Sequence, residues 1–322
     1  MKKENSGFGS LRKHEDLMLI LLTVILVVFF SIMKPSFFTL NSFASIARQI
    51  PEIGLFTLAM MLPMLVGGID LSIISTANLA TVLMGLFMNR YIPKGEENVP
   101  VVICALLICA AVCLAVGFLN GVIIAIFRIP AMLVTLGMQM VTTGISLGIT
   151  RGGTLSGFPA SFTNIGNGDI AGIPVQFIIF LIAGAILLVI LQMTSFGVRL
   201  RMYGSNHTAT VFSGTNDISL LIRTHMLSGA YVALAAIIMS SRLTSASAGA
   251  AANYLMRAIL IAVLGGVDPN GGKGRVWGIF WSVLLFQCMA SGLNVLRVNS
   301  YIVIALYGVI LLLSVFARTR RE

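Results

Sequence analysis

The residues that most suggest chemistry form a glycine-rich loop, 265–275, which reads GGVDPNGGKGR. A loop that cradles a nucleotide phosphate needs a glycine five residues before its glycine-lysine pair, and a serine or threonine after the lysine to bind magnesium. Val267 occupies the first of these positions, and Gly274 follows Lys273. We therefore predict a turn between two helices. We expect the chain to bind no cofactor and to hydrolyse no ATP itself.

Histidine chemistry is equally poorly supported. The chain has 3 histidines, His14, His207 and His225, which are dispersed and show no metal-ligand spacing. They cannot be combined with a serine and an aspartate into a credible catalytic triad. We expect no metal site and no catalytic residue, and the chain is not predicted to be an enzyme.

Four polar residues inside apolar runs are candidates to line a solute pathway: Asp70, Asn78, Gln139 and Gln287. An ionised group at membrane depth costs about 3 kcal/mol on insertion scales, and such groups are often functional. Asp70 serves equally well as a helix cap. Hydrogen bonds between helices explain the three amides just as well.

Composition identifies the elements that must position these residues. Hydrophobic residues make up 57% of the 322 positions and charged residues 10%, whereas soluble domains carry about 25% charged residues. About 20 apolar residues cross a bilayer. We predict an all-α integral membrane protein in the lipid bilayer, a bundle of about ten transmembrane helices, with nine or eleven as alternatives. The predicted spans are 17–33, 52–68, 72–89, 100–127, 131–150, 173–194, 224–241, 253–267, 276–295 and 299–316.

The positive charge indicates topology. The formal net charge is +10, but the basic residues are scattered between apolar runs, so nucleic acid is not an expected partner. An inside start with about ten crossings places both termini in the cytoplasm. The predicted organisation is a cytoplasmic N-terminal segment at 1–16, a transmembrane domain at 17–317 and a cytoplasmic tail at 318–322.

Two connections have predictable local structure. An unbroken helix from Ile53 to Met88 would be about 54 Å long, so we predict a break at 67–70, with Asp70 or Ser72 capping the following helix. In the inner connection 194–216, Ser205 or Asn206 can cap a short helix that ends at Phe212, and Gly214 can close it in a left-handed conformation. Such a helix is marginal alone, so we expect it to dock against the bundle or a cytoplasmic partner.

Short motifs extend over nearly the whole chain, and together they resemble the permease subunits of ribose-type ATP-binding-cassette sugar importers. The first motifs are the run from Gly67 to Ser72, Gly117 with Asn120-Gly121, and Ile129-Pro130 with Thr135-Leu136-Gly137. The later ones are Gly204-Ser205-Asn206 with Ala209 and Ser213-Gly214, Leu264-Gly265-Gly266 with 271–274, and Gly292-Leu293-Asn294.

The resemblance implies a coupling loop at about 195–223 that engages the ATPase through Gly204, Ser205, Asn206, Ala209, Ser213 and Gly214. It implies a cytoplasmic ATP-binding subunit that holds ATP and magnesium, a second permease copy or paralogue, and an extracytoplasmic sugar-binding protein. The expected location is the bacterial cytoplasmic (inner) membrane.

Two functions are open from the sequence. The first is the permease subunit of an importer that moves a sugar or sugar-like solute by alternating access, driven by a partner ATPase. The second is an ion-coupled secondary transporter with its site at broken helices, for which Asp70 is the one strong coupling carboxylate.

Overall fold

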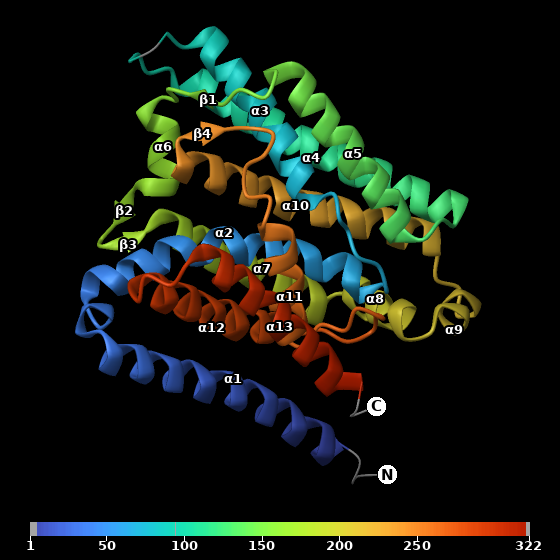
Figure 1. Ribbon diagram of the computed structural model, residues 1–322. Helices are drawn as coiled ribbons and strands as arrows, with labels where there is room; N and C mark the ends of the chain where they lie inside the picture. Colours follow the sequence, from blue (N-terminus) through green and yellow to red (C-terminus); the bar gives the residue numbers. More distant parts are fainter. Residues whose placement is uncertain (1–4, 94, 320–322) are drawn as a thin grey trace.

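The computed structural model describes residues 5–93 and 95–319, and it shows long helices running side by side across the molecule (Figure 1). The helices, in chain order, are α1 Asn5–Met33, the 3₁₀ turn η1 Pro35–Phe37, α2 Leu40–Leu65, α3 Ile73–Tyr91, α4 Val99–Phe127, α5 Ala131–Thr150, α6 Ala160–Asn167, α7 Val175–Met193, α8 Ser195–Ser205, α9 His207–Phe212, α10 Asp217–Leu243, α11 Tyr254–Leu264, α12 Val276–Val295 and α13 Ser300–Thr319.

Each predicted span overlaps one of these helices. By length and composition, 6 described helices can cross a membrane: the part of α1 from Asp16 to Met33, and α4, α5, α7, α10 and α12. At 11 residues, α11 is only about 16 Å long. The total of about ten crossings therefore stays a prediction.

α2 is enclosed by protein over its C-terminal two thirds. Every residue from Ile50 to Leu65 is buried, and the helix packs against α7, α10, α11 and α12. Its buried carboxylate, Glu52, accepts a hydrogen bond of 2.6 Å from Nε of Arg242 on α10. Because protein surrounds α2, it does not need the uniformly apolar surface of a lipid-facing helix.

Small residues bring α4 and α10 into close contact. A Cβ on Gly117 would lie 2.5 Å from the carbonyl oxygen of His225, and one on Gly229 would lie 2.5 Å from that of Cys113. A Cβ on Gly121 would lie 2.7 Å from the Cα of Ile222. The two backbones approach as helices do in membranes where glycine lines their contact.

Four two-residue strands interrupt the predicted all-α architecture. β1 (Leu155–Ser156) pairs antiparallel with β4 (Ser245–Ala246), and β2 (Asp169–Ile170) pairs with β3 (Ile173–Pro174). They lie in connections between helices, where unpaired backbone groups need partners. The bundle itself is all-α, as predicted.

The two ends of the bundle differ. The strands and α6 lie at one end, and α8 and α9 lie at the other (Figure 1). α1 begins and α13 ends on the side of α8 and α9. Residues 1–4 of the predicted N-terminal segment and 320–322 of the predicted tail lie outside the described residues.

Candidate functional site

A break segment, residues 66–72, separates α2 from α3 as the sequence predicts. Gly67 has a φ of +81°, which ends α2 at little cost for glycine. Asp70 is 4% exposed, and its Oδ1 accepts hydrogen bonds from the Ser72 backbone N at 2.8 Å and from Ser72 Oγ at 2.6 Å. Asp70 therefore holds the turn that starts α3, whereas Ser72 makes no side-chain cap bond to that helix.

Side chains from α4 and α5 hold the break segment in place. Asn120 Nδ2 donates to Ser72 Oγ at 2.9 Å. Thr135 Oγ1 accepts from the backbone N of Leu71 at 3.1 Å and lies 3.1 Å from the carbonyl oxygen of Ile69. Three separate sequence motifs thus meet in one hydrogen-bond network, which satisfies the backbone of a non-helical segment among buried side chains.

The end of α8 packs directly against the end of α2. A Cβ on Gly204 would collide with the carbonyl oxygen of Leu65 and with the backbone N of Gly272. That N donates to the same Leu65 oxygen at 2.9 Å. Ser205 lies against Gly272 as well. The glycine-rich loop connects α11 to α12 as predicted, and it packs against the ends of both α2 and α8.

The predicted short helix is confirmed as α9. Asn206 Oδ1 accepts from the backbone N of Ala209 at 2.9 Å, and Gly214 adopts a φ of +83°. Ala209, Ser213 and Gly214 are exposed, and Phe212 is 88% exposed. In the predicted coupling motif, residues 204–214, Gly204 is thus packed against the bundle, whereas most residues on and just after α9 are exposed. Their role in contacting an ATPase stays a prediction.

The structure does not bring the four candidate pathway residues together. Asn78 Nδ2 donates to the carbonyl oxygens of Ala248 at 3.0 Å and Ala250 at 2.9 Å, which fixes the loop after β4. Gln287 donates to Gln49 Oε1 at 2.9 Å. Gln139 is half-buried on α5, and Asp70 is engaged in its turn. Three of the four therefore have hydrogen-bond partners within the chain, and the role of all four in a solute pathway stays a prediction.

One exposed helix face escaped the sequence reasoning. The 18-residue apolar stretch of α5 has a mean hydropathy of 1.5 and is 17% buried, whereas the stretch in α1 has a mean hydropathy of 2.8 at the same burial. Added Cβ atoms at Gly137, Gly144 and Gly148 would meet nothing within 4 Å. α5 is thus open, but its exposed large side chains are apolar, whereas its polar Thr135, Thr142 and Ser146 are buried against the bundle. An apolar open face with glycines suits lipid or close contact with another helix. The Gly144 to Gly148 spacing is the signal that could have found it.

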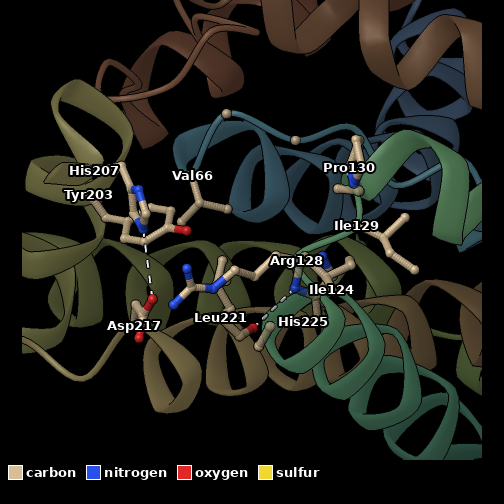
Figure 2. Close-up of a pocket in the computed structure, with 14 residues that line it drawn as sticks. Val66, Ile124, Arg128, Ile129, Pro130, Tyr203, His207, Asp217, Leu221 and His225 are labelled. Atoms are coloured by element: carbon tan, nitrogen blue, oxygen red, sulfur yellow. Dashed lines mark hydrogen bonds and ion pairs between the residues drawn. The ribbon is translucent and has the colours of Figure 1, made fainter. Parts of the chain in front are cut away.

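An inner cavity of about 280 Å³ lies between the break segment, the α4–α5 connection and the starts of α9 and α10 (Figure 2). His207 Nε2 lies 3.7 Å from Asp217 Oδ2, and its ring packs on Tyr203 with centroids 4.7 Å apart. Burial, and then the charge of Asp217, raise the pKa of the Tyr203 phenol, partly offset by Arg128. Tyr203 therefore stays a neutral hydroxyl at physiological pH.

Comparison with known proteins gives one consistent result. Residues 42–315 match the family described as branched-chain amino acid transport system / permease component. The chain is 33% identical over 301 residues to the ribose import permease protein RbsC of Bacillus subtilis, covering 92% of this chain and 91% of that protein. It is 32% identical to RbsC of Escherichia coli K12, covering 93% and 92%.

A relative with a different printed cargo is comparably similar. The autoinducer 2 import system permease protein LsrD of Escherichia coli SMS-3-5 is 30% identical over 310 residues, covering 94% of this chain and 92% of that protein. No solved structure matches the chain.

Proposed function

The chain belongs to the family of branched-chain amino acid transport system / permease components, as a ribose-type ATP-binding-cassette permease, and from this premise we propose that it imports a sugar or sugar-like polar solute. It is a multi-pass protein of the bacterial cytoplasmic membrane. The observation that carries the proposal is the packing of Gly204 against the end of α2, which connects an exposed helix, α9, to the break segment.

The proposed mechanism is mechanical coupling. A cytoplasmic ATPase that holds ATP and magnesium would contact the exposed end of α9 at Phe212 and the exposed residues Ser213 and Gly214 that follow it. Motion of α9 would pass through α8 to Leu65 by way of the glycine contact, and from there to the break segment. Alternating access then follows from a shift between two arrangements of this contact, with ATP supplying the bias.

The proposed topology has about ten crossings and both termini in the cytoplasm, with a transmembrane domain at 17–317 flanked by segments 1–16 and 318–322. The start of α1 and the end of α13 lie on the side of α8 and α9, which supports this arrangement (Figure 1). A sugar-binding protein would then dock at the opposite end, near α6 and the two small sheets.

A second permease copy or paralogue is proposed to pack against α5. The open faces of Gly137, Gly144 and Gly148 permit close approach of another helix. The half-buried Gln139 would then lie close to the partner. An ion-coupled secondary transporter is less well supported because Asp70 is already the acceptor of two hydrogen bonds in its turn.

Co-purification from detergent with the candidate cytoplasmic ATPase tests the coupling assignment. Phe212→Arg places a charge on the exposed tip of α9, and we expect the ATPase to be lost while the permease stays monodisperse. Ile170→Arg is the matched control because Ile170 is 60% exposed at the opposite end, on β2. Gly204→Arg is unsuitable, since Gly204 is packed inside the chain. Retention of the ATPase by Phe212→Arg, or loss by both variants, would contradict the assignment.

A further inference from the structure

The inner cavity has an apolar wall and a polar wall. Val66, Ile124 and Leu221 are among its apolar residues. Arg128, Tyr203, His207, Asp217 and His225 supply the polar ones (Figure 2). A volume of about 280 Å³ approaches the lower end of the range for small-molecule sites, which begins at about 300 Å³. The cavity is therefore slightly smaller than a typical small-molecule site, and only a small ligand would fit.

His225 closes one end of this site. The side chain is 1% exposed, and Nδ1 lies 3.0 Å from the carbonyl oxygen of Leu221. A carbonyl oxygen can only accept, so Nδ1 carries a proton. Nε2 has no partner among the described residues, but it is enclosed, so a ligand in the cavity does not contact it. The polar contacts to a ligand therefore come from Arg128, Tyr203, His207 and Asp217.

The charges select the class of ligand. Arg128 presents guanidinium donors to the cavity, and Asp217 presents a carboxylate. Arg128 and Asp217 carry opposite charges, so the cavity favours a ligand with no net charge. A neutral molecule with several hydroxyls donates to Asp217 and accepts from Arg128 and His207. The phenol of Tyr203 can take either role.

We propose that the inner cavity binds a neutral, sugar-like polyol from the cytoplasmic side and that binding slows the transporter. This inference rests on the proposed function. The walls belong to the break segment, to α8 and α9, and to the start of α10, which are the parts that coupling must move. A polyol bridging them stabilises the arrangement in which it binds and shifts the population toward that state. Accumulated solute would then inhibit its own import.

The test uses the complete permease–ATPase complex in lipid nanodiscs, without the binding protein. Isothermal titration is made with D-ribose, D-xylose, D-galactose and D-glucose, and D-ribose 5-phosphate serves as the anionic comparison. We expect at least one neutral sugar to bind and to lower ATPase activity. If D-ribose binds, we expect D-ribose 5-phosphate to bind about tenfold more weakly than D-ribose. If D-ribose does not bind, we expect no binding of its phosphate ester.

Two variants place the site. Asp217→Ala removes the acceptor. Arg128→Asn removes the guanidinium at a residue whose φ is +53°, a conformation that asparagine tolerates. Each should weaken sugar binding about tenfold, as expected for a hydrogen bond to a charged group, and should reduce inhibition of the ATPase. Arg223→Gln, which removes a nearby arginine that does not line the cavity, is the control and should bind as the wild type does.

Three results would overturn the inference: no neutral sugar binds, the phosphate ester binds as tightly as the neutral sugars, or both cavity variants bind like the wild type. Uptake by the wild-type complex, measured with the binding protein and ATP, separates this failure from failure of the proposed function. Uptake with no cytoplasmic-side binding rejects the cavity alone. Absence of any ATP-driven uptake rejects the function as well.

Discussion

Replacing Gly204 with alanine tests the contact that joins α8 to α2. The added Cβ would collide with the carbonyl oxygen of Leu65 and the backbone N of Gly272, and would lie 3.0 Å from the carbonyl carbon of Gly271. All three neighbours are backbone atoms, which cannot rotate away as a side chain can. The clash is relieved only if α8 moves outward or the hydrogen bond from Gly272 N to Leu65 O is broken.

The size of the effect follows from these two costs. Overpacking by one methyl group costs about 1–3 kcal/mol, and loss of one hydrogen bond costs about 1 kcal/mol. We expect Gly204→Ala to destabilise the folded protein by about 2–4 kcal/mol if both costs apply. Because the contact lies between the helix proposed to face the ATPase and the break segment, we also expect less solute moved for each ATP hydrolysed.

Thermal unfolding in detergent measures the first effect, and uptake with ATP consumption in proteoliposomes measures the second. Gly249→Ala is the control, because a Cβ there meets nothing within 4 Å. If Gly204→Ala unfolds at the wild-type temperature and transports with wild-type coupling, the inward contact does not carry the mechanical link, and the reasoning is refuted.

The other predictions concern three buried or bonded carboxylates. Asp70→Asn keeps an acceptor oxygen for Ser72 and should retain ATP-driven uptake; loss of uptake would favour ion coupling. Asp70→Ala leaves two donors unsatisfied, which costs about 1–3 kcal/mol and should lower the unfolding temperature. Arg242→Ala leaves the charge of Glu52, which is 1% exposed, without its partner and should destabilise the protein by about 3–5 kcal/mol in thermal unfolding. Adding Glu52→Gln should recover part of this stability. Equal stability of the single and double variants would contradict the prediction. The nearby Ser161 side chain, together with hydrogen bonds from the backbone N–H groups of Ser161 and Ala160, lowers the pKa of Glu97 below its ordinary 4.5. The stabilisation of α6 by Glu97 is therefore present above pH 4.5 and is lost as the pH falls through the lowered value. Hydrogen exchange at α6 should show this loss on acidification, and Glu97→Gln should remove the pH dependence.

Local structure was predictable because its causes lie close together in the chain. The break at Gly67 follows from a helix too long for one membrane crossing. The short helix α9 follows from Asn206 and Gly214, which cap it at either end. Both inferences need only helix geometry, capping and the left-handed preference of glycine.

The contacts that join distant segments were not predictable. Asn120 meets Ser72 across 48 positions, and Asn78 meets Ala248 across 170. A single sequence shows that an asparagine lies in a span, but it does not show which carbonyl or hydroxyl will face it. The same holds for Gly204, whose motif indicates the coupling loop but not that the glycine points inward against Leu65.

The open face of α5 was not predicted from the sequence, because mean hydropathy does not show how much of a helix is buried. The 18-residue apolar stretches of α5 and α10 have the same mean hydropathy of 1.5, but 61% of the stretch in α10 is buried and only 17% of the stretch in α5. A comparatively polar span is expected in a protein interior, and only the structure shows that one of these two lies outside the bundle of a single chain.

ATP-dependent uptake in a defined system tests the central claim most directly. The permease is reconstituted in proteoliposomes with its candidate ATPase and binding protein, and uptake of radiolabelled D-ribose and other neutral sugars is followed. The account predicts uptake only when ATP and magnesium are supplied on the ATPase side and all components are present. Uptake by the permease alone, driven by a proton or sodium gradient, would contradict it and establish a secondary transporter.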